Sequence, residues 1–170
     1  MATPTPRPIL VPIDFSDNCK AALRHAARLA EPFDQPLLIL HVVHETADQA
    51  GYYRSRDTSG RTLPLYDIAE QLLERFVDEL RAEQGISQSL ATAGTLVVCG
   101  LPANRILEVA EARDAGMIVM GTHGRQGLAR LLLGSVAQHI AQHSRIPVTT
   151  IRVQDAIEGA ALAPAWQVAS

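Results

Sequence analysis

The sequence predicts an α/β protein, a single doubly wound three-layer domain whose five-stranded parallel sheet has the order 3-2-1-4-5. Three observations support this prediction. Strand-like apolar runs alternate along the chain with segments of helical periodicity. Several runs are apolar at every position, as in parallel sheets that helices cover on both faces. The 170 residues, 47% of them hydrophobic, suit one domain with a full core.

The first predicted unit is a strand, a helix and a second strand. The apolar run 9–13 ends at Asp14, and either Ser16 or Asp17 can cap the helix that follows. The run 36–43 is apolar on both faces and predicts the second strand. This part of the chain therefore reads as a βαβ unit.

The segment 44–62 differs from the preceding strand in composition, because glycine, tyrosine, serine and charged residues replace the apolar pattern. We interpret it as a long, mobile connection. Helical periodicity resumes from Leu65 to about Gly85, where glycine suits a helix C-cap. The run 94–100 predicts the third strand.

The remaining elements complete the predicted sheet. Pro102 stands at the start of a third helix, and the run 117–120 is the fourth strand. After a glycine-rich loop, residues 135–143 form a fourth helix and residues 147–153 the fifth strand. Right-handed crossovers then place helices on both faces.

We expect the domain to comprise residues 9–153, with a flexible N-terminus over 1–8 and a C-terminal tail over 154–170. The tail is weakly amphipathic, and it either docks through Trp166 or is disordered.

Composition and charge exclude few function classes, and they give no support to nucleic-acid binding. The net charge is −3, and no basic cluster with interleaved aromatic residues predicts a nucleic-acid partner. The first apolar run is too short for a signal peptide or a membrane span, so we expect a cytoplasmic protein without membrane contact. Cys19 and Cys99 form no CxxC pair, and we interpret both as buried or half-buried packing thiols.

A glycine motif follows the fourth predicted strand and carries the main functional signal. Gly121 and Gly124, then nine residues, then Gly134 and Ser135 read as G-x2-G-x9-G-S. Glycine lets the backbone approach an anion closely, and a helix N-terminus offers unpaired N–H groups and partial positive charge. The motif therefore predicts phosphate binding.

The predicted topology selects the same place independently. In an open α/β sheet a ligand binds beyond the carboxyl ends of the strands where the order reverses, here between strands one and four. Asp14 ends strand one and Gly121 begins the loop after strand four. Two alternatives stay open for Asp14, a hydrogen bond to ribose hydroxyls or a turn and capping role. Neither a P-loop nor a G-x-G-x-x-G fingerprint follows strand one.

In these residues the chain resembles the nucleotide-binding branch of the universal stress protein family. Residues 121–135 match the branch signature G-x2-G-x9-G-[ST] without a gap, and the resemblance extends from 11–16 through 40–42 to 147–148. It implies a fold like that of the adenine nucleotide alpha hydrolases. It also implies an adenine nucleotide as ligand, namely ATP with or without Mg or Mn.

The resemblance implies roles for the matching positions. On the base and ribose side these are Pro12, Ile13, Asp14, Val42 and Met120. On the phosphate side these are Gly121, Gly124, Gly134, Ser135 and Val136. Arg125 either adds positive charge near the phosphates or is an ordinary solvated arginine.

Three functions follow from such a site. The first is a stress-response regulatory protein in which ATP occupancy changes the conformation or the affinity for an unknown partner protein. The second is a slow ATPase or phosphoryl-transfer enzyme that uses the same site, although no second carboxylate stands beside the motif and no catalytic residue is identified. The third is a structural dimer with a vestigial pocket, against which the intact glycines speak.

Each candidate histidine has a structural alternative to a functional role. His123 in the glycine loop is either a base or a turn residue. His139 and His143 have metal-ligand spacing without a third ligand, and solvated helix histidines are the alternative. His41 and His44 flank the end of the second predicted strand, where we expect an ordinary surface position, and a role near the adenine edge is the alternative.

The fifth strand predicts a homodimer. In the order 3-2-1-4-5 it lies at an edge with unpaired backbone groups, and universal stress proteins, which the chain resembles, commonly dimerise there. The alternative is a monomer whose edge the tail covers.

Overall fold

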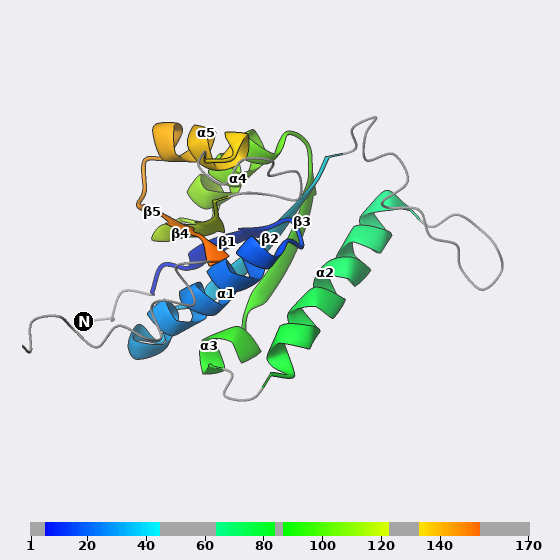
Figure 1. The fold of residues 1–170 in the computed structure, drawn as a ribbon, viewed down its shortest axis with the longest axis vertical. Helices are drawn as coiled ribbons and strands as arrows, with labels where there is room; N and C mark the ends of the chain where they lie inside the picture. The colour runs from blue at the N-terminus through cyan, green and yellow to red at the C-terminus, as the bar shows by residue number, and fades with distance from the viewer. Residues whose placement is uncertain (1–5, 45–63, 84–86, 123–132, 154–170) are drawn as a thin grey trace, which may run out of the picture.

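Five parallel strands form one sheet in the order β3-β2-β1-β4-β5, which confirms the predicted topology (Figure 1). The computed structural model describes residues 6–44, 64–83, 87–122 and 133–153. The strands are β1 (Ile9–Ile13), β2 (Leu37–Val43), β3 (Gly94–Cys99), β4 (Met117–Gly121) and β5 (Val148–Ile151). The helices are α1 (Asp17–Ala30), the 3₁₀ helix η1 (Glu31–Phe33), α2 (Leu65–Arg81), α3 (Gln88–Ala91), α4 (Pro102–Ala112) and α5 (Ser135–His143).

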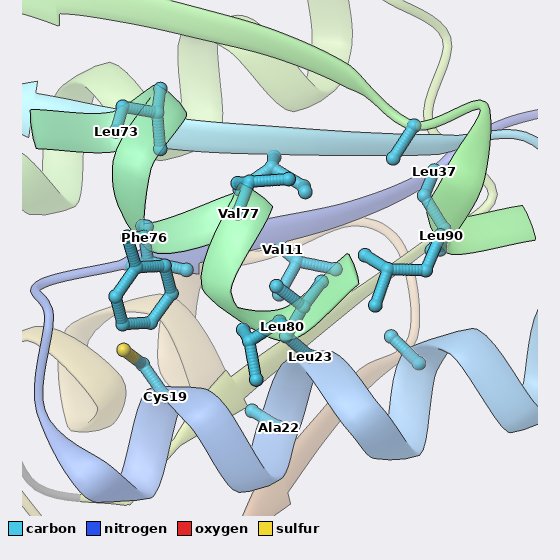
Figure 2. Close-up of a cluster of buried hydrophobic side chains, with 14 of the residues drawn as sticks. Val11, Cys19, Ala22, Leu23, Leu37, Leu73, Phe76, Val77, Leu80 and Leu90 are labelled. Carbon is cyan, nitrogen blue, oxygen red and sulfur yellow. The ribbon is translucent and has the colours of Figure 1, made fainter. Parts of the chain in front are cut away.

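Helices cover both faces of the sheet, as Figure 1 shows, with α1, α2 and α3 on one face and α4 and α5 on the other. Each face has its own hydrophobic cluster. Figure 2 shows the first, in which Leu23 of α1 and Val77 and Leu80 of α2 pack over Val11 of β1. The second packs Leu10 and Ile118 of the central strands against α4 and α5. Both faces of the central strands are therefore buried, which is why the strand sequences are apolar throughout.

The structure contains two short helices that were not predicted, and two elements end earlier than predicted. The short helices η1 and α3 were not predicted, because three or four residues carry too little periodicity. Helix α2 ends at Arg81, before the predicted end near Gly85, a residue that lies outside the described ones. Strand β5 ends at Ile151 instead of residue 153, because the Val153 N–H turns away from the sheet and donates to Oδ1 of Asn18 (3.3 Å).

One further prediction is wrong. Cys99 is exposed at the end of the edge strand β3, whereas Cys19 is buried under α2 as expected. Among the described residues, no helix has the length and apolar character needed to cross a membrane.

Candidate functional site

The carboxyl ends of β1 and β4 lie beside each other but stop pairing early. The ladder between the two strands joins Ile9 to Met117 and Leu10 to Ile118, while β1 itself continues to Ile13. The Ile9 N–H donates to the Pro36 carbonyl before β2, so backbone alternation turns the position of Pro12 towards β4. Proline has no N–H, and the ladder therefore lacks a donor there. Between β1 and β2 the pairing continues to Ile13 and His41.

Asp14 forms a hydrogen-bonded turn at the end of β1. Its Oδ1 accepts from the Ser16 N–H (3.1 Å) and the Ser16 hydroxyl (2.6 Å). The Ser16 Oγ in turn accepts from the Cys19 N–H (3.3 Å), which caps α1. The turn role of Asp14 is thus present in the structure, and a ribose contact stays a prediction.

An aromatic stack supports this turn. Phe15 has a φ of 65°, a left-handed backbone conformation that is costly for a bulky residue. Its ring packs on His41, with centroids 4.5 Å apart, and on Phe76 of α2, with centroids 5.4 Å apart. The packing offsets the backbone strain and keeps the Asp14 turn beside the end of β2.

His41 is buried and not at the surface as predicted. Its Nδ1 lies 2.9 Å from the carbonyl oxygen of Ile13, so Nδ1 carries the proton and donates. The signal was present in the sequence, because His41 is the one polar residue of the run 37–43. A polar side chain in a strand buried on both faces needs a partner, and here the partner belongs to the site.

Two of the candidate base-side residues lie on the same face of the sheet. Met120 is buried in the cluster against α4 and α5, and Val42 is half-buried against that cluster. They lie on β4 and β2, the two neighbours of β1. Pro12 and Ile13, also predicted to line the site, are buried on β1 between them.

Gly121 ends β4 against the first turn of α1. A Cβ there would lie 2.9 Å from the Cβ of Asn18, 3.1 Å from the Asn18 carbonyl carbon and 3.2 Å from the Cys19 nitrogen. Two of these atoms are backbone, so only glycine fits without moving the helix. The structure thus explains this glycine by helix packing.

Helix α5 begins at the same edge with an open first turn. Its N-cap is Gly134, and no side chain among the described residues caps it. The Gly134 N–H donates to the Thr122 carbonyl (2.8 Å), which fixes the helix start to the end of β4. Ser135 is exposed and Val136 half-buried at the open turn. By contrast, α1 is capped by Ser16 and carries the acidic Asp17 in its first turn. As far as the described residues go, the first turn of α5 therefore offers an anion N–H donors that no side chain caps, and the first turn of α1 does not.

Several predicted residues are not placed. Gly124, Arg125 and His123 lie outside the described residues. Within the described ranges, no three His, Cys, Asp or Glu side chains gather in a metal-binding cluster. His139 and His143 stack with ring centroids 4.2 Å apart, and Nδ1 of His143 bonds to the His139 carbonyl.

Comparison with known proteins assigns a family. The model of the Universal stress protein family matches residues 5–152. A universal stress protein of Methanocaldococcus jannaschii is 32% identical over 144 residues, which are 85% of this chain and 81% of that protein. One of Bacillus subtilis is 32% identical over 157 residues, 85% of this chain and 97% of that protein.

Solved structures show the same fold. The universal stress protein of Archaeoglobus fulgidus in complex with dAMP superposes with a TM-score of 0.59 at 23% identity, covering 87% of this chain and 99% of that one. A universal stress protein in complex with cAMP superposes with a TM-score of 0.55 at 22% identity, covering 86% and 96%.

Proposed function

The chain belongs to the universal stress protein family, and from that premise we propose that it binds ATP at the carboxyl ends of β1 and β4 as a regulatory protein. The observation that carries the proposal is the uncapped N-terminus of α5, hydrogen-bonded to the end of β4 beside an unpaired stretch of β1. Two structures of the same fold were solved with adenine nucleotides, dAMP and cAMP, which supports this ligand class.

The proposed pose follows from the positions of the candidate residues. The ribose lies by Asp14, the adenine between Val42 and Met120, and the phosphates over the first turn of α5. Gly134, Ser135 and Val136 supply backbone N–H groups, and the Ser135 hydroxyl adds a donor. A Mg or Mn ion bound with ATP would neutralise phosphate charge, and the exposed Ser135 hydroxyl is suited to hold it. Gly121, Gly124 and Arg125 complete the proposed phosphate side.

The direct test is mass spectrometry of small molecules released by heat from freshly purified protein, together with calorimetric titration of ATP. Gly134→Val should weaken ATP binding about tenfold or more, roughly 1.4 kcal/mol, because the side chain displaces the phosphates. Gly94→Val is the matched control, since Gly94 begins β3, away from the site. A Cβ added there would lie 3.7 Å from its nearest neighbour, Leu38 Cδ1. Equal affinities in the two folded variants contradict the proposal.

A slow ATPase is the second candidate, because an enzyme would use the same phosphate site. Turnover of labelled ATP separates it from a regulator that only binds.

We also propose a cytoplasmic homodimer through β5. The carbonyls of Pro147 and Ile151 accept hydrogen bonds from β4, so alternation turns the Thr150 N–H towards the open edge. A twofold axis would let this edge pair with its copy.

A further inference from the structure

Arg152 follows β5 at the edge of the sheet where the glycine motif lies. The Thr122 N–H donates to the Ile151 carbonyl (2.9 Å), and the Thr122 carbonyl accepts from the Gly134 N–H (2.8 Å). Backbone hydrogen bonds thus join the end of β5, the end of β4 and the start of α5 in series. Arg152 comes next in the chain after this junction.

The alternation of β5 turns its residues to the two faces of the sheet in turn, up to the end of the strand at Ile151. Ile151 packs in the cluster on the α1 face, and Val148 packs against the cluster on the α5 face. Residues of odd number therefore face α1 and those of even number face α5. Arg152 is the first residue past this strand, next to the junction with the start of α5.

The guanidinium of Arg152 has an unsatisfied donor. Its Nε is buried, and it has no hydrogen-bond partner among the residues that the structure describes. Five other arginines are paired with carboxylates, namely Arg7, Arg24, Arg81, Arg105 and Arg145. Arg28, Arg75 and Arg113 lack such a pair in the described chain as well, but they are exposed, whereas Arg152 is half-buried. Nε of Arg105 is also buried without a partner, but that guanidinium already pairs with Glu108. Within the described chain, no carboxylate pairs with Arg152.

A buried, unpaired donor on a cation is costly unless an anion meets it. The proposed site supplies such anions, because the phosphates of the nucleotide would bind at the start of α5, which backbone hydrogen bonds join to the end of β5. Arg152 adds a full positive charge to the partial charge of the helix end.

We infer that Arg152 determines the preference of this site for a polyphosphate chain over a single phosphate. The inference rests on the proposed ATP site. Asp14 follows β1, Gly121 ends β4 and Arg152 follows β5, three neighbouring strands. Adjacent strands lie about 4.8 Å apart, so the span from β1 to β5 is about 10 Å. A ribose at β1 places the first phosphate near β4 and directs the terminal phosphates towards β5.

The test compares ATP with AMP by calorimetric titration of Arg152→Gln. ATP affinity should fall about tenfold, and AMP affinity should change less than about threefold, because AMP does not reach β5. Arg145→Gln is the matched control, since it removes the same charge from a side chain that is 91% exposed, and it should change neither affinity. Equal losses of ATP and AMP binding, or unchanged ATP binding, overturn the inference.

A second variant covers the case in which Arg152→Gln does not fold. Arg152→Lys keeps the charge but loses the planar fork, so ATP affinity should lie between that of the wild type and that of Arg152→Gln. If a folded Arg152→Lys variant keeps both the ATP affinity and the selectivity over AMP of the wild type, the role of Arg152 stands and its charge alone accounts for it. Loss of AMP and ATP binding to the same extent contradicts the assignment.

Inorganic tripolyphosphate separates this inference from the proposed function. If the wild type binds tripolyphosphate in an Arg152-dependent manner but not ATP, the nucleotide proposal fails and the role of Arg152 stands. If ATP binds equally well to the wild type and to Arg152→Gln, the nucleotide proposal stands and the role of Arg152 fails. Binding of neither ligand to the wild type overturns both.

Discussion

Replacing Gly121 by alanine tests whether this glycine serves helix packing. The added Cβ would lie 2.9 Å from the Asn18 Cβ and 3.1 Å from the Asn18 carbonyl carbon. Carbon atoms in favourable contact are about 3.5–4.0 Å apart, so the start of α1 must move by roughly half an ångström or more. The neighbours are the backbone and the Cβ of a helix, which no rotamer change relieves.

The magnitude follows from two opposing effects. Overpacking of this kind costs about 1–3 kcal/mol, and loss of glycine freedom in the unfolded chain returns about 0.4–1 kcal/mol. We therefore expect Gly121→Ala to lower the free energy of unfolding by about 1–2 kcal/mol.

Gly94→Ala is the matched control, because Gly94 is also a strand glycine. Its added Cβ would lie 3.7 Å from Leu38 Cδ1, an ordinary contact. The control should be unchanged or more stable by about 0.4–1 kcal/mol.

The assay is urea denaturation of both variants, followed by the midpoint at an unchanged slope m. Equal midpoints for Gly121→Ala and Gly94→Ala would refute the packing argument.

Four further outcomes are expected. Asp14→Ala should lower ATP affinity by about 1–3 kcal/mol and affinity for a deoxyribose analogue by less. Equal losses for the two ligands would assign Asp14 to the turn alone. In that case Asp14→Asn, which keeps the Oδ1 acceptor of the turn, should not show the losses. Thr150→Pro should convert a dimer to a monomer in sedimentation without breaking the β4 pairing, and a monomeric wild type excludes the strand-mediated dimer. Burial and the charge of Asp14 raise the pKa of Cys19 from 9.0 to about 12, so iodoacetamide at pH 8 should label only Cys99 in the native protein and both thiols in denaturant. Because the folded-state pKa of Cys19 is the higher one, its contribution to stability is complete below pH 9.0 and is lost as the pH rises from there to about 12, a decline that Cys19→Ala should remove from the pH profile of unfolding.

The order of elements was readable from local patterns. Runs such as 9–13 and 36–43 are apolar at every position because helices cover both faces, and helical periodicity marks α1, α2, α4 and α5. The glycine motif and Asp14 were also found by type and spacing, and the topology rule placed both at one edge of the sheet. These features depend on residues that are near one another in the chain.

Other features depend on which distant segments meet. Whether Gly121 is a glycine for packing was settled by Asn18, 103 positions earlier in the chain, and His41 is buried because its strand lies beside Ile13. Its imidazole was predicted at the surface because a lone polar residue carries no periodicity of its own.

The sequence by itself therefore determined the fold class, the strand order and the edge at which we propose the site, since hydrophobic periodicity and glycine chemistry are local. Only the tertiary structure decided that Pro12 faces β4 and that, among the described residues, Ser16 caps α1 while no side chain caps α5. It also decided that Arg152 lies at the same edge with a buried Nε that no described residue pairs with. Each of these depends on the alternation and register of strands that are far apart in the chain, because the direction of an N–H group or a side chain is set by the neighbour it meets in space.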